Sequence, residues 1–327
     1  FHSHFYAIGV MERVKVLPCW ESQEVSVRPL KELVSELQLG EGRTNQNFIV
    51  DCAASRYFVR LGADLPFYGV SRVREQAAAR AAEAAGIAPA VRYTEADVMV
   101  VDFVEKSRAL TEADLHAAGQ EGVKSELLRR VGRSLRQLHA TPVPDELEAF
   151  LREIGTIGWG GPHLEKWLRY AEEEKYSRLP LLHGLRSLID QLNRAAGPLG
   201  PNKFCHFDLL ADNLVLKEDG NILLVDFEYS APGQPLMDLA VLAMGCSLSS
   251  VEEQSLLSAY LDREATEAEG LQFQALRVLA ALRETFWGVT AELSQSSALS
   301  MEEAVCYTDM NFQKFVELRE AFLSSAG

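Results

Sequence analysis

Apolar and polar positions form short runs in the first third of the chain. Between residues 46 and 104, the runs NFIVDC, RYFVRL and MVVDFV are rich in β-branched and aromatic residues, which are typical of strands. One Ala-rich stretch, Arg72–Ala85, is followed by Gly86 and Pro89, which commonly end a helix. This part of the chain is therefore predicted to be a small sheet that carries one helix.

The pattern becomes helical from Leu110 onward. Apolar residues follow one another at intervals of three and four in two places, at Leu128, Val131, Leu135 and Leu138 and at Leu279, Leu282, Phe286, Val289 and Leu293. This spacing places each set on one face of a helix. Further helices are predicted over 164–176, 181–196 and 301–323.

One β-like insert interrupts the helices. The segment LVLKEDGNILLVDF, residues 214–227, has two apolar runs around Asp219 and Gly220, a pair that is typical of a hairpin turn. An antiparallel hairpin brings its two ends together. Residues just before the first strand and just after the second are therefore expected to be neighbours.

Length and composition agree with two lobes and an α+β fold. A chain of 327 residues with 47% hydrophobic content corresponds to about two domains, each able to bury a core. We place the boundary where the sheet pattern ends at Val104, which gives lobes over 11–104 and 105–327. Phe1–Val10 lacks the basic start and apolar centre of a secretory signal. Met11 is compatible with a native start, so these ten residues carry none of the predicted function.

The charge of the chain disfavours several kinds of partner. Its 32 basic and 47 acidic side chains leave a formal net charge of −15, which repels nucleic acid and anionic membranes and attracts a small cationic substrate. The longest apolar run, Leu239–Gly245, is too short to span a membrane. Five scattered cysteines without a CxxC pair favour a reducing compartment, and the cytoplasm is expected. The oligomeric state is open, and a homodimer is compatible with the sequence.

The most informative polar residues lie at the ends of the hairpin. His206 and Asp208 precede the first strand, Asn213 begins it, and Asp226 follows the second. Phosphoryl transfer to an alcohol requires a carboxylate that accepts the hydroxyl proton and oxygen ligands for the Mg²⁺ of ATP. Asp208 suits the first role, Asn213 and Asp226 suit the second, and His206 would fix the loop. Single Asp and Asn residues are ordinary in turns, but the complete set favours catalysis.

A glycine-containing turn precedes the first predicted strand. It contains Gly40, Gly42, Thr44 and Asn45. Small residues let backbone amides approach phosphate oxygens closely, so the turn is a candidate phosphate-binding loop. The other interpretation is a turn with no ligand.

Arg60 and Glu75 favour the phosphate-binding interpretation. Arg60 ends the next strand, and Glu75 lies at the start of the predicted helix. A cation held over nucleotide phosphates by a helix carboxylate is the ion-pair device of kinases, and a guanidinium binds phosphate through two parallel hydrogen bonds. The other interpretation is that Arg60 is a solvated edge charge and that Glu75 pairs with Arg72.

The order of these parts resembles the choline/ethanolamine kinase branch of the aminoglycoside phosphotransferase superfamily, which has a protein-kinase-like fold. The resemblance covers about residues 33–323. Its sharpest matches are CHFDLLADN (205–213) and VDFEYS (225–230), and GRTNQNF, FVRL, GIAP and RQLHA agree with it. It implies an ATP- and Mg²⁺-dependent kinase with Asp208 as the catalytic base and 11–104 as the nucleotide-binding lobe. The adenine would lie against the linker between the lobes, at Val101, Asp102, Phe103 and Val104.

The resemblance also implies that the acceptor alcohol lies in the helical lobe, near Glu228, Tyr229 and Trp287. A quaternary ammonium cannot donate hydrogen bonds, so aromatic faces and carboxylates hold it, each aromatic contact contributing about 0.5–2 kcal/mol. Trp287 adjoins the apolar stripe at Phe286, so it either lines this site or fills a helix contact. Thr290 stands where animal members carry a second tryptophan, which implies a smaller or differently built cage.

Two classes of function stay open at this point. One is a kinase for choline or a related amino alcohol, with an aminoglycoside, thiamine or another polar metabolite as the alternative acceptor. The other is a nucleotide-binding pseudokinase, against which the joint presence of Asp208, Asn213 and Asp226 argues. Asp238, in QPLMDLA, is expected to brace the catalytic loop, the other interpretation being a charge at a helix N-terminus.

Overall fold

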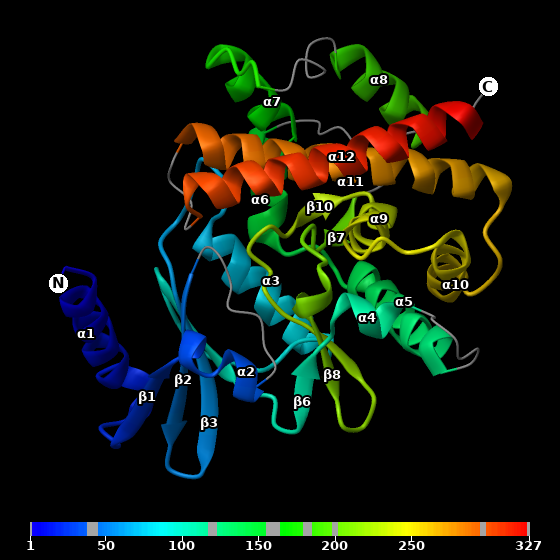
Figure 1. The fold of residues 1–327 in the computed structure, drawn as a ribbon. Coiled ribbons are helices and arrows are strands. Elements are labelled where there is room, and N and C mark those ends of the chain that lie inside the picture. The colour runs from blue at the N-terminus through cyan, green and yellow to red at the C-terminus, as the bar shows by residue number, and fades with distance from the viewer. Residues whose placement is uncertain are drawn as a thin grey trace.

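The structure is a computed structural model that describes residues 2–37, 45–116, 123–154, 164–178, 185–197, 202–294 and 299–325. Most strands gather at one end of the molecule and the long helices at the other (Figure 1). The architecture is therefore α+β, as predicted. Helix α1 (His2–Lys15) contacts β1 (Figure 1), and its C-terminal half packs on one face of the sheet, since Val14 shares a core cluster with Val50 and Val98.

The N-terminal sheet has five antiparallel strands in the order β1-β2-β3-β5-β4. They span Val25–Pro29 (β1), Gln46–Cys52 (β2), Ser55–Leu61 (β3), Val91–Glu95 (β4) and Val98–Asp102 (β5). Strands β2, β3 and β5 confirm the three predicted runs. The edge strands β1 and β4 lie outside those runs, because most of their residues are only half-buried and their apolar pattern is weak.

Both faces of the sheet are covered. Phe48 and Val50 pack in one core cluster with Trp20, whereas Ile49 packs in another with Leu30. Successive residues of a strand point to opposite faces, so the continuous apolar run in β2 reflects burial on both sides. Three short helices, η1 (Pro18–Trp20), η2 (Leu30–Glu32) and α2 (Val34–Leu37), connect β1 to its neighbours.

Helix α3 (Arg72–Ala84) is the single helix inserted between β3 and β4. It confirms the predicted Ala-rich helix and ends where predicted. Gly86 has a φ of +75°, a conformation that favours glycine and closes helix C-termini. Six of its residues, among them Arg72 and Glu75, are buried, so this helix carries charged groups into the interior.

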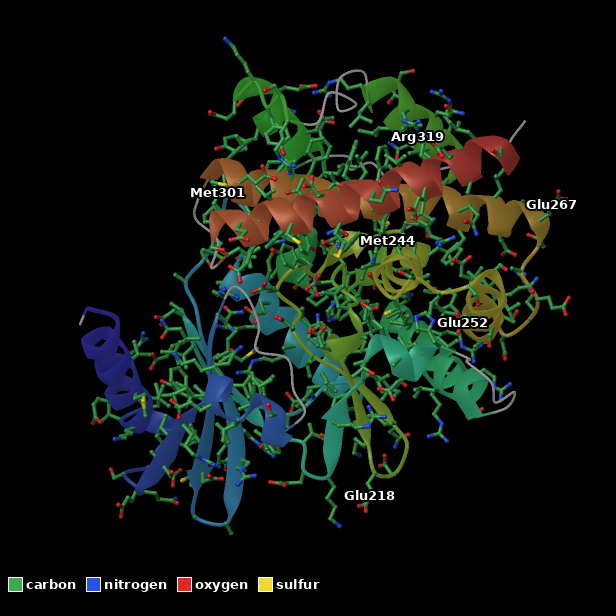
Figure 2. The ribbon with its side chains drawn as sticks, in the orientation of Figure 1. Glu218, Met244, Glu252, Glu267, Met301 and Arg319 are labelled. Atoms are coloured by element: carbon green, nitrogen blue, oxygen red, sulfur yellow. The ribbon has the colours of Figure 1, made fainter. Side chains whose placement is uncertain are left out.

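The helical part is built around α11. The helices are α4 (Glu112–Leu115), α5 (Val123–Ala140), α6 (Asp145–Ile154), α7 (Leu164–Glu173), α8 (Leu185–Ala195), α9 (Pro235–Gly245), α10 (Ser250–Leu261), α11 (Glu267–Ser294) and α12 (Met301–Ser325). Helix α11 packs against α7, α8, α9 and α12, and Figure 1 shows α12 running along it. The predicted stripe on α11 is confirmed, since Leu279, Leu282, Phe286 and Val289 are buried. In Figure 2, Met244 of α9 lies within this packed interior, whereas Glu218 and Glu267 lie at the periphery.

The predicted hairpin is also present. Strands β8 (Leu214–Lys217) and β9 (Ile222–Leu224) pair antiparallel around Gly220, whose φ is +81°. Strand β6 (Ser107–Ala109) joins β8 as a third strand, and β7 (Lys203–Cys205) pairs with β10 (Ala231–Gly233). The polar stretch EKSR at the predicted lobe boundary therefore leads into a strand of the helical lobe. Among the described helices, none combines the length and the apolar character needed to cross a membrane.

Candidate active site

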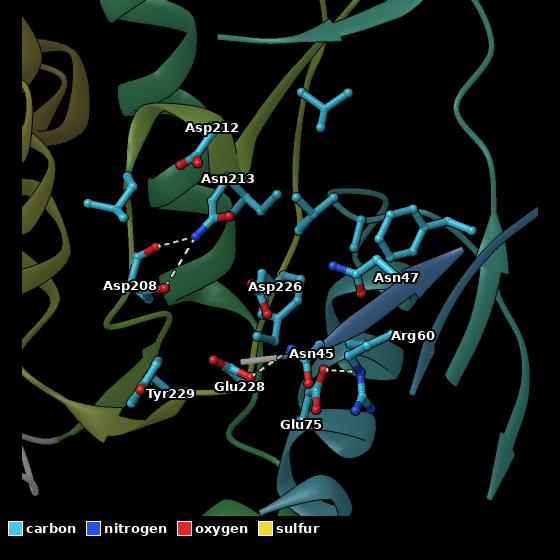
Figure 3. Close-up of a pocket in the computed structure, with 18 of the residues that line it drawn as sticks. Asn45, Asn47, Arg60, Glu75, Asp208, Asp212, Asn213, Asp226, Glu228 and Tyr229 are labelled. Carbon is cyan, nitrogen blue, oxygen red and sulfur yellow. Dashed lines mark hydrogen bonds and ion pairs between the residues drawn. The ribbon is translucent and has the colours of Figure 1, made fainter. Parts of the chain in front are cut away.

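A cavity of about 670 Å³ lies between the sheet and the helical part. Its lining residues come from β2, β3 and α3, from the segments after β5, β7 and β9, and from α11 and α12. Segments far apart in the sequence thus meet around one space (Figure 3). A deep cavity with converging polar groups is the usual form of an active site.

The loop after β7 is held by Asp238 of α9. The carboxylate of Asp238 accepts hydrogen bonds from the backbone N–H groups of His206 (2.7 Å) and Phe207 (2.7 Å), and it lies 3.0 Å from Nε2 of His139. Phe207 has a φ of +64°, a strained conformation that these bonds support. Cys205, His139 and Asp238 have the composition of a metal cluster, but both Asp238 oxygens already accept hydrogen bonds. Asp238 therefore braces the loop, as expected.

His206 ties the same loop to the hairpin. Its Nε2 donates to the carbonyl of Val225 (2.9 Å), and its Nδ1 accepts from the N–H of Asp208 (3.2 Å). Burial lowers the pKa of His206, which favours the neutral ring that this pattern requires. The residue is fully buried and does not line the cavity. It positions Asp208 and is not itself in reach of a substrate.

Asp208, Asn213 and Asp226 face one region of the cavity (Figure 3). Nδ2 of Asn213 donates to the backbone carbonyl of Asp208 (2.7 Å) and to its Oδ2 (3.4 Å). The N–H of Val225 donates to the carbonyl of Asn213 (3.1 Å), which closes the hairpin and brings Asp226 beside Asn213. The spacing of these residues along the chain had predicted this convergence.

The electrostatics of this region suit a divalent cation. Burial is the main reason that the pKa of Asp208 is raised to about 8, and the carboxylate of Glu284 adds to the effect. Burial also raises the pKa of Asp226, and repulsion from Glu228 contributes. Crowded carboxylates next to an amide oxygen are the hard donor set that Mg²⁺ prefers, and a cation would relieve their repulsion. Asn213 and Asp226 therefore fit the metal role expected from the sequence.

Arg60 lies across the cavity, at the end of β3. Its Nε is 2.9 Å from Oε1 of Glu75, and the two side chains are 4% and 0% exposed. The interpretation of Arg60 as a solvated edge charge is therefore wrong. Its buried Nη2 has no hydrogen-bond partner among the described residues. A buried donor without a partner costs free energy, and a phosphate oxygen would satisfy it.

Glu75 is shared with a second arginine. Nη1 of Arg72 lies 2.7 Å from Oε2 of Glu75 and 3.0 Å from Oε2 of Glu228, and its Nη2 donates to Oδ1 of Asn45 (2.6 Å). The Arg72–Glu75 pair, which was the alternative to an Arg60–Glu75 pair, thus coexists with it. Glu228, which the resemblance placed near the acceptor, contacts the sheet side of the cavity through Arg72 and Asn45.

The nucleotide-base end of the predicted site is an apolar part of the cavity. Val101, Asp102, Phe103 and Val104 line it, together with Phe58, Met99 and Leu224. Oδ1 of Asp102 accepts from Nε of Arg92 (2.6 Å). Asn45 also lines the cavity, whereas Gly40, Gly42 and Thr44 lie outside the described residues.

Aromatic and charged side chains form the opposite end of the cavity. The ring of Trp287 on α11 lies 5.0 Å from that of Tyr307 on α12, and Nε1 of Trp287 donates to the hydroxyl of Tyr229 (3.0 Å). The hydroxyl of Tyr307 donates to Oε2 of Glu284 (2.6 Å), whose Oε1 pairs with Nη2 of Arg283 (2.6 Å). All five residues line the cavity. Trp287 therefore lines the cavity and also fills a helix contact.

Comparison with known proteins identifies the family. Residues 36–285 match the phosphotransferase enzyme family APH. The chain belongs to this phosphotransferase family. Protein LicA of Haemophilus influenzae is 22% identical to this phosphotransferase over 258 residues, which are 76% of this chain and 69% of that protein.

Solved structures establish the protein-kinase-like fold of this phosphotransferase. A choline/ethanolamine kinase family protein from Mesorhizobium loti has a TM-score of 0.71 at 19% identity, covering 96% of this chain and 94% of that chain. A spectinomycin phosphotransferase in complex with ADP and spectinomycin has a TM-score of 0.56 at 14% identity, covering 90% of this chain and 98% of that chain. The fold class predicted from the sequence is confirmed.

The structure adds three residues to the predicted site of the phosphotransferase, Arg283, Glu284 and Tyr307. Glu284 stands three residues before Trp287, so helical spacing alone places both on one face. Tyr307 carries no comparable local signal. It reaches the cavity only because α12 packs along α11.

Proposed function

We propose that this protein transfers the γ-phosphoryl group of ATP to the hydroxyl of choline or a related amino alcohol, in the presence of Mg²⁺. The observation that carries the proposal is the position of Asp208. Asp208 lies beside Asn213 and Asp226 and opposite Arg60 (Figure 3). The aromatic residues Tyr229 and Trp287 line the same cavity. A proton acceptor between a phosphate site and an alcohol site is the arrangement that phosphoryl transfer requires.

The protein groups have distinct roles in this reaction. Arg60 binds phosphate oxygens, and Asp208 orients the acceptor hydroxyl and accepts its proton. The hydroxyl oxygen forms a bond to the γ-phosphorus as the bond from this phosphorus to the oxygen shared with the β-phosphate breaks, which releases ADP. Asn213 and Asp226 would hold Mg²⁺, which neutralises charge on the phosphates when bound. The raised pKa of Asp208, about 8, makes its carboxylate a stronger base than an exposed aspartate.

The far end of the cavity supports a cationic acceptor. Trp287, Tyr229 and Tyr307 offer aromatic surface, and Asp208 and Glu284 are carboxylates of the same lining, Glu284 being paired with Arg283. An ammonium group is stabilised by both kinds of contact. The structural similarity to a choline/ethanolamine kinase family protein supports the same acceptor class.

Experiment separates this proposal from two kinds of alternative, a kinase with a different acceptor and a pseudokinase. A spectinomycin phosphotransferase shares the fold, so an aminoglycoside is one alternative acceptor, and thiamine or another polar metabolite is another. A pseudokinase is the second alternative, and it would bind nucleotide without turnover.

The cysteines are all free, and on this basis we propose the reducing cytoplasm as the compartment.

ATP consumption measured with choline, ethanolamine, thiamine and spectinomycin tests the proposal. We expect turnover with choline or ethanolamine. Asp208→Asn should lower kcat by about 100-fold or more while sparing ATP binding, because it removes the proton acceptor alone. Asp219→Asn, in the exposed hairpin turn, is the matched control and should retain full turnover. Turnover with spectinomycin alone would contradict the acceptor class, and wild-type turnover by Asp208→Asn would remove this residue from its role.

A further inference from the structure

Arg72 lies behind the cavity wall and bonds to three residues that line the cavity, Asn45, Glu75 and Glu228, and neither the phosphate site nor the acceptor site uses it. It is the first residue of α3 and is fully buried. Its Nη1 is shared between Glu75 (2.7 Å) and Glu228 (3.0 Å), its Nη2 donates to Asn45 (2.6 Å), and its Nε donates to the carbonyl of Ala63 (3.0 Å).

The partners of Arg72 belong to both parts of the molecule. Glu75 holds Arg60, the proposed phosphate-binding residue. Glu228 lies two residues after Asp226, in the segment that would hold the metal. Asn45 directly precedes β2 and closes the network, since its Nδ2 donates to Oε2 of Glu228 (3.0 Å). Figure 3 shows Asn45 and Glu228 meeting between Asp226 and Glu75.

Arg72 and Asn45 pack closely against the backbone at Gly62. A Cβ atom at Gly62 would lie 2.8 Å from Nη2 of Arg72 and would also overlap Oδ1 of Asn45. The absence of a Cβ atom at position 62 therefore leaves room for the hydrogen bond between Arg72 and Asn45. The guanidinium is thus fixed by four hydrogen-bonding partners, and the orientation of each partner depends on it.

The guanidinium of Arg72 also balances the charge of two buried carboxylates, those of Glu75 and Glu228. Glu75 is 1% and Glu228 is 3% exposed, and a buried carboxylate without a cation is strongly destabilised. Loss of Arg72 would leave Arg60 as the cation nearest to Glu75, so Arg60 would be held more tightly by protein carboxylates. It would also remove the cation paired with Glu228, which lies in the segment that carries Asp226.

We propose that Arg72 is a positioning residue that couples the phosphate-binding Arg60 to the metal-binding segment at Asp226. In this proposal Glu228 serves the coupling and does not recognise the acceptor. The inference rests on the proposed function only in that Arg60 and Asp226 bind MgATP, and it is independent of the identity of the acceptor.

Calorimetric titration with ATP, with and without Mg²⁺, tests the coupling without any acceptor. Arg72→Met and Glu228→Gln should each weaken MgATP binding by about 10- to 100-fold, the range of coupling between linked sites. The double variant should bind no more weakly than the weaker single variant, because one interaction is removed in all three. Arg72→Lys, which keeps the charge but not the planar fork, should recover part of the affinity.

A matched control separates coupling from loss of a buried arginine. Arg277 also joins two helices, α11 and α10, with its Nη1 2.7 Å from Oε1 of Glu253 and its side chain only 12% exposed, and it does not line the cavity. Arg277→Met should lower the melting temperature and leave MgATP affinity unchanged. Measuring the melting temperature of every variant shows which of them are folded at the titration temperature.

The outcomes distinguish this inference from the proposed function. Additive losses in the double variant, or a Glu228→Gln variant that binds MgATP normally and raises only the KM of the acceptor, would overturn the coupling. Wild-type protein that binds MgATP but phosphorylates no amino alcohol would refute the proposed acceptor and leave the coupling to be decided by the titrations. Wild-type protein that binds no MgATP would refute both.

Discussion

At the scale of single residues, Asp238 sets the position of the catalytic loop without contacting the cavity. Its carboxylate accepts from two consecutive backbone N–H groups, those of His206 and Phe207. Burial would raise the pKa of Asp238, but hydrogen bonding and electrostatic attraction from His139 and His206 together outweigh burial and hold this pKa below its usual range. The side chain therefore stays ionised and accepts hydrogen bonds with both oxygens.

Asp238→Asn should loosen this loop while changing the side-chain volume very little. The amide has only one acceptor oxygen, so its NH₂ group must face the backbone N–H of either Phe207 or His206. We expect the free energy of unfolding to fall by about 3 kcal/mol and kcat to fall by about 100-fold as Asp208 loses its orientation. Urea unfolding and steady-state kinetics measure the two effects. Asp190→Asn, exposed on α8, should change neither, and an unaltered Asp238→Asn variant would contradict the bracing role.

At the scale of secondary-structure elements, the contact between α11 and α12 shapes the aromatic end of the cavity, where we propose that the acceptor binds. Gly288 of α11 faces Thr308 of α12 so closely that a Cβ atom there would lie 2.5 Å from Oγ1 and 3.0 Å from Cα of Thr308. The neighbouring residues on the two helices are Trp287 and Tyr307, whose rings contact each other. The close approach of the helices is therefore what brings the two rings together.

Gly288→Ala should separate the two helices and alter acceptor binding selectively. Because backbone atoms of Thr308 are in the way, we expect the free energy of unfolding to fall by about 1–3 kcal/mol. We also expect the KM of the acceptor to rise while the KM of ATP stays close to the wild-type value.

Gly270→Ala on the same helix is the control for this substitution. Nothing lies within 4 Å of a Cβ atom there, so this change should stabilise the protein by about 0.5–1 kcal/mol through helix propensity. If Gly288→Ala matched Gly270→Ala in stability and kinetics, the close contact between Gly288 and Thr308 would not determine the shape of this end of the cavity.

Elements and site residues could be predicted from the sequence where their signal is local. The hairpin turn at Gly220 and the spacing of Asp208, Asn213 and Asp226 lie within one short segment, so chain order alone indicated their convergence. Strand β6 is three residues long and exists because it pairs with β8, which no local pattern reveals. Tyr307 and the bridge from Arg72 to Glu228 likewise depend on packing between elements that are distant in the sequence.

At the scale of the whole molecule, folding collects carboxylates of both lobes in one buried cleft. Asp208, Asp226, Glu75 and Glu228 all line or adjoin the same cavity, in a chain whose formal net charge is −15. Arg60 and Arg72 balance part of this charge. Burial, together with the charge of the carboxylates that these arginines do not balance, raises the pKa of Asp208 and Asp226. Protons therefore stabilise the apo fold, and a cation would replace them when it binds.

The pH dependence of stability should reveal this cleft. An aspartate has a pKa of about 3.9 in an unfolded chain, whereas that of Asp208 is about 8 in the folded chain. Between these values the folded protein holds a proton that unfolding releases, so the contribution of Asp208 to stability falls as pH rises from about 4 to 8 and is constant below this window.

Urea unfolding at several pH values, with wild type and Asp208→Asn compared, measures this contribution. The wild type without Mg²⁺ should lose stability relative to the variant as pH rises from 5 to 8. Asp219→Asn should follow the wild type, because Asp219 lies outside the cleft. Addition of MgATP should make the stability difference between wild type and Asp208→Asn depend less on pH, since a bound cation replaces the proton as the partner of the carboxylates. A wild type whose stability relative to Asp208→Asn rises over this range would show that Asp208 is ionised in the folded apo protein and would contradict the electrostatic description of the site.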